Sequence, residues 1–200
     1  MLLIHGGKIR SEATLHRPGS VAGVSFPELL DHYRAIASIT ALPFLAYYFP
    51  AAGSGPLSLG QLEEICALPG VAGLKFTDYD LYTLSLLIRS GKIVFNGRDE
   101  VLSAGLLMGA GGGIGSIYNI KPAWFVELYR HARASRWAEA RQVQDRINDL
   151  IRILLEFPFM SALKQVMTWE GIDCGLALRP RRPISLQQRS DLKNALASLI

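Results

Sequence analysis

The sequence has only two cysteines and no long apolar run, and these shortages exclude several classes of protein. Cys66 and Cys174 lie far apart, so neither a disulfide framework nor a zinc site is predicted. The four histidines show no metal-ligand spacing. No apolar run reaches membrane-spanning length, and Met1-Leu-Leu-Ile4 is too short for a secretory signal. We therefore expect a cytoplasmic protein with no membrane partner and no metal.

Clustered positive charge is also missing. The formal net charge is +4 over 200 residues, which is far from the basic stripe of a nucleic-acid-binding protein. The densest basic run, Arg179-Pro-Arg-Arg-Pro183, stands between prolines and is interpreted as a solvated connection. Half of the residues are hydrophobic and 19% are charged, as in a globular domain. We expect a small-molecule partner and no nucleic acid.

From Phe26 onward, strand and helix patterns alternate four times. The strands are predicted at 42–49, 71–77, 92–96 and 109–116, with helices before, between and after them at 26–37, 58–68, 79–89 and 99–108. Such alternation favours parallel strands joined by right-handed crossovers, in either an open doubly wound sheet or a (β/α)8 barrel. After Pro122 only helices are predicted, at 122–133, 136–156, 158–169 and 186–199.

These patterns divide the chain into three segments. Residues 1–24 are an unassigned lead-in, in which 1–5 could form one short strand. Residues 25–121 read as a partial (β/α) barrel. Residues 122–200 read as the last barrel helix followed by a C-terminal helical appendage. The predicted fold class is therefore α/β.

One lysine stands out in the strand 71–77. Lys75 lies near the carboxyl end of an otherwise apolar run, Val71-Ala-Gly-Leu-Lys-Phe-Thr77. Lysine is rarely buried without a partner, so it either extends to solvent, forms an ion pair or serves chemistry. In the last case, removal from water favours the neutral amine, which can attack a ketone and form a Schiff base.

Other reactive side chains follow the remaining strands. In a barrel, such groups gather at the carboxyl ends of the strands. Here those ends carry Tyr47, Tyr48, Lys75, Thr77, Gly97, Asp99, Glu100, Gly115 and Ser116. Each has a structural alternative: the tyrosines can be packing residues, and the acids can favour a helix start. The glycine run 109–115 has no G-x-G-x-x-G match, so its glycines are better explained by tight packing or close approach to a ligand.

Four motifs, in order and with matching spacings, carry a resemblance to a known family. They are Tyr47-Tyr-Phe-Pro50, Gly73-Leu-Lys-Phe-Thr77 with Asp80-Leu81, Asn96-Gly-Arg-Asp-Glu100, and Gly109-Ala-Gly-Gly-Gly-Ile-Gly-Ser-Ile-Tyr-Asn119. From about Phe26 to the C-terminus the chain resembles the dihydrodipicolinate synthase/N-acetylneuraminate lyase family of Schiff-base aldolases. The lyase branch is the nearer likeness, because Ala52 stands where the synthase branch has an arginine. Two departures are Tyr48-Phe49 between the motif tyrosine and proline, and Arg98.

The resemblance implies roles for these residues. Lys75 would form an imine with the C2 ketone of a 2-keto acid, and Tyr47 would shuttle a proton to and from the leaving aldehyde. Thr77 would bond near the reacting carbons. The tail of the sugar would be held by Gly97, Asp99, Glu100, Gly115 and Ser116. The resemblance also implies pyruvate as a small-molecule partner, no cofactor, and a homodimer or homotetramer.

The resemblance leaves part of the family's fold unaccounted for. The family's (β/α)8 barrel needs roughly 250 residues, and only four strands are recognised here. No Gly-Ser/Thr-Thr-Gly-Glu-like motif, which holds the substrate carboxylate in the family, occurs in the sequence. We therefore expect an N-terminally truncated TIM-barrel chain, with two strand edges left unpaired. Three functions stay open: a lyase for N-acetylneuraminate or a similar sugar acid, a non-catalytic binding half-barrel, and a sibling pyruvate-dependent aldolase or synthase.

Overall fold

A computed structural model describes residues 2–5, 8–10, 14–16, 24–39, 41–52, 55–197 and 199, with side chains from Val24 onward. The chain separates into two compact units: residues 2–115 form one, and residues 116–200 form the other. The first unit contains the sheet, and the second is helical. The boundaries expected from the sequence, at 24/25 and 121/122, stay predictions.

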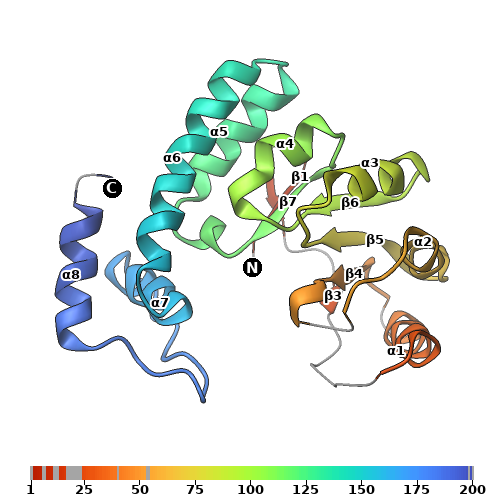
Figure 1. Cartoon of the computed structure of the whole chain (residues 1–200), viewed down its shortest axis with the longest axis horizontal. Coiled ribbons are helices and arrows are strands. Elements are labelled where there is room, and N and C mark those ends of the chain that lie inside the picture. The colour runs from red at the N-terminus through yellow and green to blue at the C-terminus, as the bar shows by residue number, and fades with distance from the viewer. Residues whose placement is uncertain are drawn as a thin grey trace. The chain divides into compact units, whose positions relative to one another are not determined.

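Four strands of the first unit are parallel and neighbour one another in chain order. They are β4 (Phe44–Tyr48), β5 (Val71–Phe76), β6 (Ile93–Asn96) and β7 (Gly112–Gly115). Each is joined to the next by a helical segment, as Figure 1 shows. The predicted alternation and the parallel pairing are therefore confirmed. Because the strands run in one direction, their carboxyl ends share one edge of the sheet.

Both outer edges of this four-stranded unit are paired with strands of the lead-in, and the two open edges expected from the sequence lie at the outermost of these strands. The lead-in supplies the partners: β3 (Thr14–His16) lies parallel to β4, and β1 (Leu2–His5) lies antiparallel to β7. A further strand, β2 (Lys8–Arg10), pairs with β1. Strands of three residues are too short to show a hydrophobic period, which is why the sequence left them unassigned. Within the described residues no pairing joins β2 to β3, so the seven-stranded sheet is open.

The helices of the first unit lie within or close to the ranges predicted from the sequence. They are α1 (Phe26–Ser38), α2 (Leu59–Ala67), α3 (Leu81–Arg89) and α4 (Leu102–Leu107). Ser58 accepts a hydrogen bond from the Gln61 amide at the start of α2, and Asp80 does the same for Thr83 in α3. The segment expected as one helix over 99–108 begins instead with a 3-10 turn, η2 (Asp99–Val101).

The two faces of the sheet differ in what they bury. Phe44, Ala46 and Tyr48 alternate along β4 with Leu45 and Tyr47, because successive strand side chains point to opposite faces. The first three join the large apolar core under α1, α2 and α3, together with Leu29, Leu62, Leu74, Phe76, Leu84 and Val94. The other face has a small apolar cluster of Leu45, Phe95 and Ile114. Burial of the first face holds the helices on the sheet.

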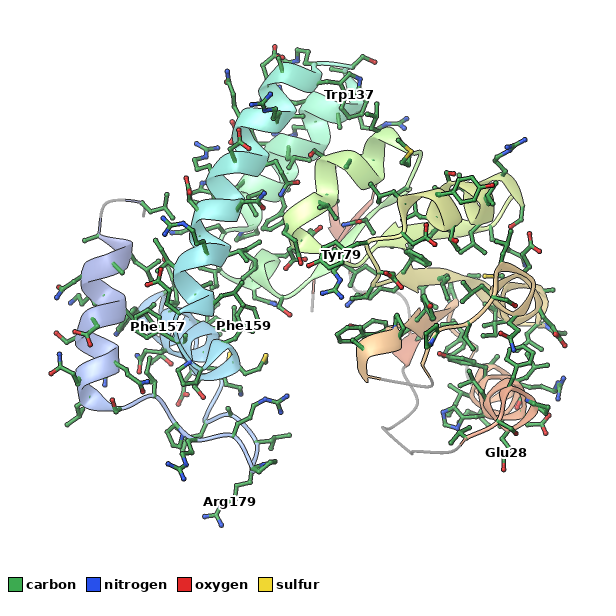
Figure 2. The ribbon with its side chains drawn as sticks, viewed as in Figure 1. Glu28, Tyr79, Trp137, Phe157, Phe159 and Arg179 are labelled. Carbon is green, nitrogen blue, oxygen red and sulfur yellow. The ribbon has the colours of Figure 1, made fainter. Side chains whose placement is uncertain are left out.

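The second unit is built from helices, as the sequence predicted. After η3 (Ile117–Asn119) come α5 (Pro122–Arg133), α6 (Trp137–Leu155), α7 (Phe159–Trp169) and α8 (Leu186–Leu196). Helices α5 and α6 lie side by side in Figure 1 and pack against each other. The connection 179–183 is exposed, and Arg179 points away from the helices in Figure 2. In the described part of the chain, no helix is long and apolar enough to cross a membrane.

Candidate active site

Lys75 is buried on the sheet face that does not carry the large apolar core. It is the penultimate residue of β5, lies opposite Tyr47 of β4 in the parallel register, and is 4% exposed. Its Nζ lies 4.0 Å from the centroid of the Tyr47 ring. Strand alternation explains this placement, since the next residue, Phe76, points to the apolar core. The amine is thus held against an aromatic face and away from bulk water.

The adjacent tyrosines Tyr47 and Tyr48 occupy different environments. The backbone carbonyl of Tyr47 accepts a hydrogen bond of 3.0 Å from the Tyr33 hydroxyl, and its ring stacks on Phe49 at 6.1 Å. Tyr48 instead packs on Phe76, with ring centroids 5.3 Å apart, and its hydroxyl accepts a bond from the Leu57 amide. Burial raises the pKa of Tyr48, and the Leu57 bond opposes that shift. Tyr48 is therefore a packing residue, and Tyr47 is the phenol beside Lys75.

Thr77 follows β5 directly and packs against Gly97. Thr77 is 5% exposed, and among the described residues its Oγ1 has no hydrogen-bond partner. A Cβ at Gly97 would lie 2.0 Å from Thr77 Oγ1 and 2.9 Å from the Phe76 carbonyl oxygen. The Gly97 amide also donates to that carbonyl at 2.8 Å. Only glycine fits at this position, because the backbone after β6 passes directly over the end of β5.

Asp99 and Gly115 make a second close approach, between the ends of β6 and β7. Asp99 is 8% exposed and is the first residue of η2. A Cβ at Gly115 would lie 1.4 Å from Asp99 Oδ1, so the carboxylate occupies the space that a side chain would need. The predicted glycine and the predicted acid are thus in contact. The carboxyl ends of β5, β6 and β7 thus hold the Thr77 hydroxyl and the Asp99 carboxylate in place.

A group of four side chains, which we call the Arg98 cluster, lies beside these residues and consists of Phe49, Tyr79, Arg98 and Glu100. The Arg98 guanidinium carbon is 4.3 Å from the centroid of the Tyr79 ring and 5.4 Å from that of Phe49. Glu100 accepts a hydrogen bond from the Tyr79 hydroxyl, and its Oε1 lies 3.8 Å from an Arg98 nitrogen. Tyr79, labelled in Figure 2, lies on the segment between β5 and α3. The bond to Glu100 raises the pKa of the Tyr79 phenol, and partial burial adds to this shift.

Three members of this cluster, Phe49, Tyr79 and Arg98, were not predicted as site residues. Each comes within three residues of a strand end, which is the signal that could have identified them. Asn96 was missed as well: it ends β6, is fully buried, and donates a 2.6 Å hydrogen bond to the Arg98 carbonyl. A Cβ at Gly105 would lie 2.7 Å from Asn96 Oδ1. Asn96 therefore fixes the backbone that positions Gly97 and Arg98.

The structure brings together most of the predicted residues, in contacting pairs. Lys75 lies against Tyr47, Thr77 against Gly97, and Asp99 against Gly115. Glu100 belongs to the Arg98 cluster. Ser116 is the first residue of the second unit, so its place in the site stays a prediction.

A cavity of about 450 Å³ in the second unit is lined by residues of α7, α8 and the connection between them. None of the predicted site residues lines it. Within the residues that the structure describes, no group of three or more His, Cys, Asp or Glu side chains could hold a metal ion.

Comparison with known proteins gives the family. The model of the dihydrodipicolinate synthetase family matches residues 21–199. The chain belongs to this family. It is 34% identical over 198 residues to the N-acetylneuraminate lyase of Rhizobium meliloti, and 33% identical over 211 residues to that of Citrobacter koseri. Both relatives are lyases, which confirms the branch that the four motifs indicated.

A solved structure agrees with this assignment. The N-acetylneuraminate lyase of Fusobacterium nucleatum complexed with pyruvate is 27% identical, with a TM-score of 0.83 over 94% of this chain. The parallel strands and their helices are thus of the family's (β/α)8 barrel type, as expected. The Rhizobium meliloti match covers 98% of this chain and so includes most of the lead-in. This chain spans about two thirds of its relatives' length: 66% of the Rhizobium meliloti lyase, 71% of the Citrobacter koseri lyase and 64% of the Fusobacterium nucleatum structure.

Proposed function

We propose that this chain carries the imine-forming half of a Schiff-base lyase that cleaves N-acetylneuraminate or a related 2-keto-3-deoxy sugar acid. The products would be pyruvate and an aldose. The observation that carries the proposal is Lys75: a buried lysine whose Nζ lies 4.0 Å from the Tyr47 ring, at the carboxyl edge of a parallel sheet. The similarity to lyases, one of them complexed with pyruvate, supports it.

In the proposed reaction Lys75 acts as the nucleophile. Its neutral Nζ attacks the C2 carbonyl carbon, water leaves, and a protonated imine remains. The C3–C4 bond then breaks, and its electron pair moves toward the imine nitrogen to give an enamine. Protonation of the enamine at C3 and hydrolysis by water release pyruvate and restore the lysine. No metal or organic cofactor enters this sequence, because the protonated imine is itself the electron sink.

Tyr47 would contribute in two ways. Its hydroxyl would accept the proton of the C4 hydroxyl as the aldehyde forms, a role that typically contributes about 10²–10⁴-fold. Its ring face lies against Nζ and would stabilise the positive charge of the imine by about 0.5–2 kcal/mol. The two contributions can be separated, because phenylalanine keeps the ring and lacks the hydroxyl.

The other residues would bind the substrate. Thr77 offers a buried hydroxyl, with no partner in the described part of the chain, directly after the lysine strand. Asp99 and Glu100 would accept hydrogen bonds from sugar hydroxyls. Gly97 leaves room for Thr77, and Gly115 leaves room for the Asp99 carboxylate. Ser116 would add a further hydroxyl.

The test measures pyruvate release and imine formation separately. Wild-type protein is assayed with N-acetylneuraminate and with other 2-keto-3-deoxy sugar acids, and the imine is trapped by borohydride in the presence of pyruvate. Tyr47→Phe should trap as well as wild type but release pyruvate about 10²–10⁴-fold more slowly. Tyr47→Leu should release pyruvate slowly as well, and it should in addition trap more weakly than wild type, because it loses the ring. Equal turnover by Tyr47→Phe and wild type would remove Tyr47 from the mechanism.

A second candidate is a module that forms the imine or binds a 2-keto acid but does not cleave it. The observation in its favour is that the chain spans about two thirds of the lyases it matches. Trapping at Lys75 without pyruvate release from any sugar acid would establish this alternative. Release from a different 2-keto-3-deoxy acid, with none from N-acetylneuraminate, would instead identify a sibling aldolase.

A further inference from the structure

We propose that Arg98 selects substrates whose chain ends in an anionic group, either a carboxylate or a phosphate, at the end far from the keto acid. This inference rests on the proposed imine chemistry at Lys75 and specifies the substrate class. A neutral polyhydroxyl chain would leave the N–H donors of Arg98 without an anion to bind, because the Glu100 carboxylate lies 3.8 Å away.

Arg98 lies on a continuous path of contacts from Lys75. Lys75 Nζ is 4.0 Å from the Tyr47 ring centroid, the Tyr47 and Phe49 centroids are 6.1 Å apart, and the Arg98 guanidinium carbon is 5.4 Å from the Phe49 centroid. The guanidinium cannot be farther from Nζ than these three contacts laid end to end. A chain attached to Lys75 and bound along Gly97, Asp99 and Glu100 would therefore carry its far end to Arg98.

Two aromatic rings contact the guanidinium and take up none of its N–H donors. The Arg98 guanidinium carbon lies 4.3 Å from the Tyr79 ring centroid and 5.4 Å from that of Phe49, as in cation–π contacts. The five N–H donors lie along the edge, in a fork that matches a carboxylate or a phosphate. The Arg98 side chain is 22% exposed, and its buried Nε has no hydrogen-bond partner within the described residues.

The ion pair between Arg98 and Glu100 is too long to occupy the N–H donors of the guanidinium. The nitrogen and oxygen are 3.8 Å apart, beyond the range of a charge-assisted hydrogen bond, and the same Glu100 oxygen already accepts the Tyr79 hydroxyl. Glu100 thus orients Arg98 without occupying its donors. Asn96 fixes the backbone beneath it through the bond to the Arg98 carbonyl.

The test compares three 2-keto-3-deoxy acids of equal chain length that end in a hydroxymethyl group, a carboxylate or a phosphate. For each acid, the concentration that gives half-maximal borohydride trapping at Lys75 is measured, which requires no bond cleavage. With wild-type protein, the half-maximal concentration should be lower for an anionic-ended acid than for the neutral acid, by about tenfold or more. The anionic acid that traps at the lower concentration shows whether the substrate ends in a carboxylate or in a phosphate.

Three variants locate the preference. Arg98→Met fills the space between the rings without charge and should abolish the preference. Arg98→Lys keeps the charge but not the fork, and should retain part of it. Arg89→Met removes an exposed charge at the end of α3, outside the Arg98 cluster, and should behave as wild type. The pyruvate signal of each variant measures how much competent Lys75 it contains.

The outcomes separate this inference from the function on which it rests. Trapping by pyruvate with equal trapping by all three acids would overturn the role of Arg98 and leave the imine chemistry standing. A preference that survives in Arg98→Met would also overturn it. No trapping by pyruvate in folded wild-type protein would overturn both.

Discussion

The two faces of the parallel sheet differ in what they hold, and the neighbouring residues Lys75 and Phe76 illustrate the difference. Phe76 points to the large apolar core and packs against Tyr48, whereas Lys75, one residue earlier, lies against Tyr47 on the other face. The apolar face holds α1, α2 and α3 on the sheet and so fixes where the strands end. The opposite face can then hold an amine and a phenol, which add little to stability. The core face thus fixes the strand ends, and the other face holds the residues proposed to form the imine.

The largest expected difference between the two faces is in how a substitution changes the free energy of unfolding. Phe76→Ala should lower the free energy of unfolding by about 3–5 kcal/mol, because it empties the buried centre of the core. Lys75→Met should change it by less than about 1 kcal/mol, because a buried amine costs desolvation that methionine avoids. Urea unfolding of both variants measures the difference. A loss in Lys75→Met as large as in Phe76→Ala would make Lys75 a structural residue.

The close approach at the carboxyl edge gives a smaller expected effect. Gly97→Ala should lower the free energy of unfolding by about 1–3 kcal/mol, because the added methyl would overlap Thr77 Oγ1 and the Phe76 carbonyl. Gly60→Ala is the matched control: it lies in α2 with open space around it, and should raise stability by about 0.5–1 kcal/mol. Equal effects of the two substitutions would show that the end of β6 does not press on β5.

The smallest predicted effect concerns the cap of the helix that follows the lysine strand. Hydrogen bonds from the Thr83 side chain and backbone lower the pKa of Asp80. A lowered pKa stabilises the fold above the unfolded value of about 3.9, and this contribution is lost as pH falls through the folded value. Asp80→Ala should cost about 0.5–2 kcal/mol at pH 7 and less at pH 3, whereas Asp80→Asn should keep the cap. Urea unfolding at both pH values measures this. A cost that does not shrink at pH 3 would contradict the charge-based part of the account.

The parallel core of the fold could be predicted from the sequence because its strands are apolar and its helices are amphipathic. Ser58 identifies the start of α2, and strand alternation places Tyr47 and Lys75 on one face. In the lead-in, the short strand expected within residues 1–5 is confirmed as β1, but β2 and β3 could not be predicted, because they have three residues each. Their pairing depends on the edges of β1 and β4, which no local pattern shows.

The candidate site was predictable as a set of residues and not as a set of contacts. The list of strand ends included Asp99 and Gly115, but their contact depends on the neighbouring ends of β6 and β7. Arg98 stood out only as a departure from the family's motif, and its stacking on Tyr79 and Phe49 needs three separate loops to meet. Side chains from different loops come together only in the folded sheet, so sequence spacing alone could not place them.

The central claim is that one buried amine, Lys75, condenses with a 2-keto acid. The direct measurement is reduction of folded protein with borohydride in the presence of pyruvate, followed by digestion and mass spectrometry of each lysine peptide. The account predicts an adduct on Lys75 and none on Lys92, which precedes β6 at the opposite edge of the sheet. No adduct on Lys75, or adducts spread over the exposed lysines, would contradict it.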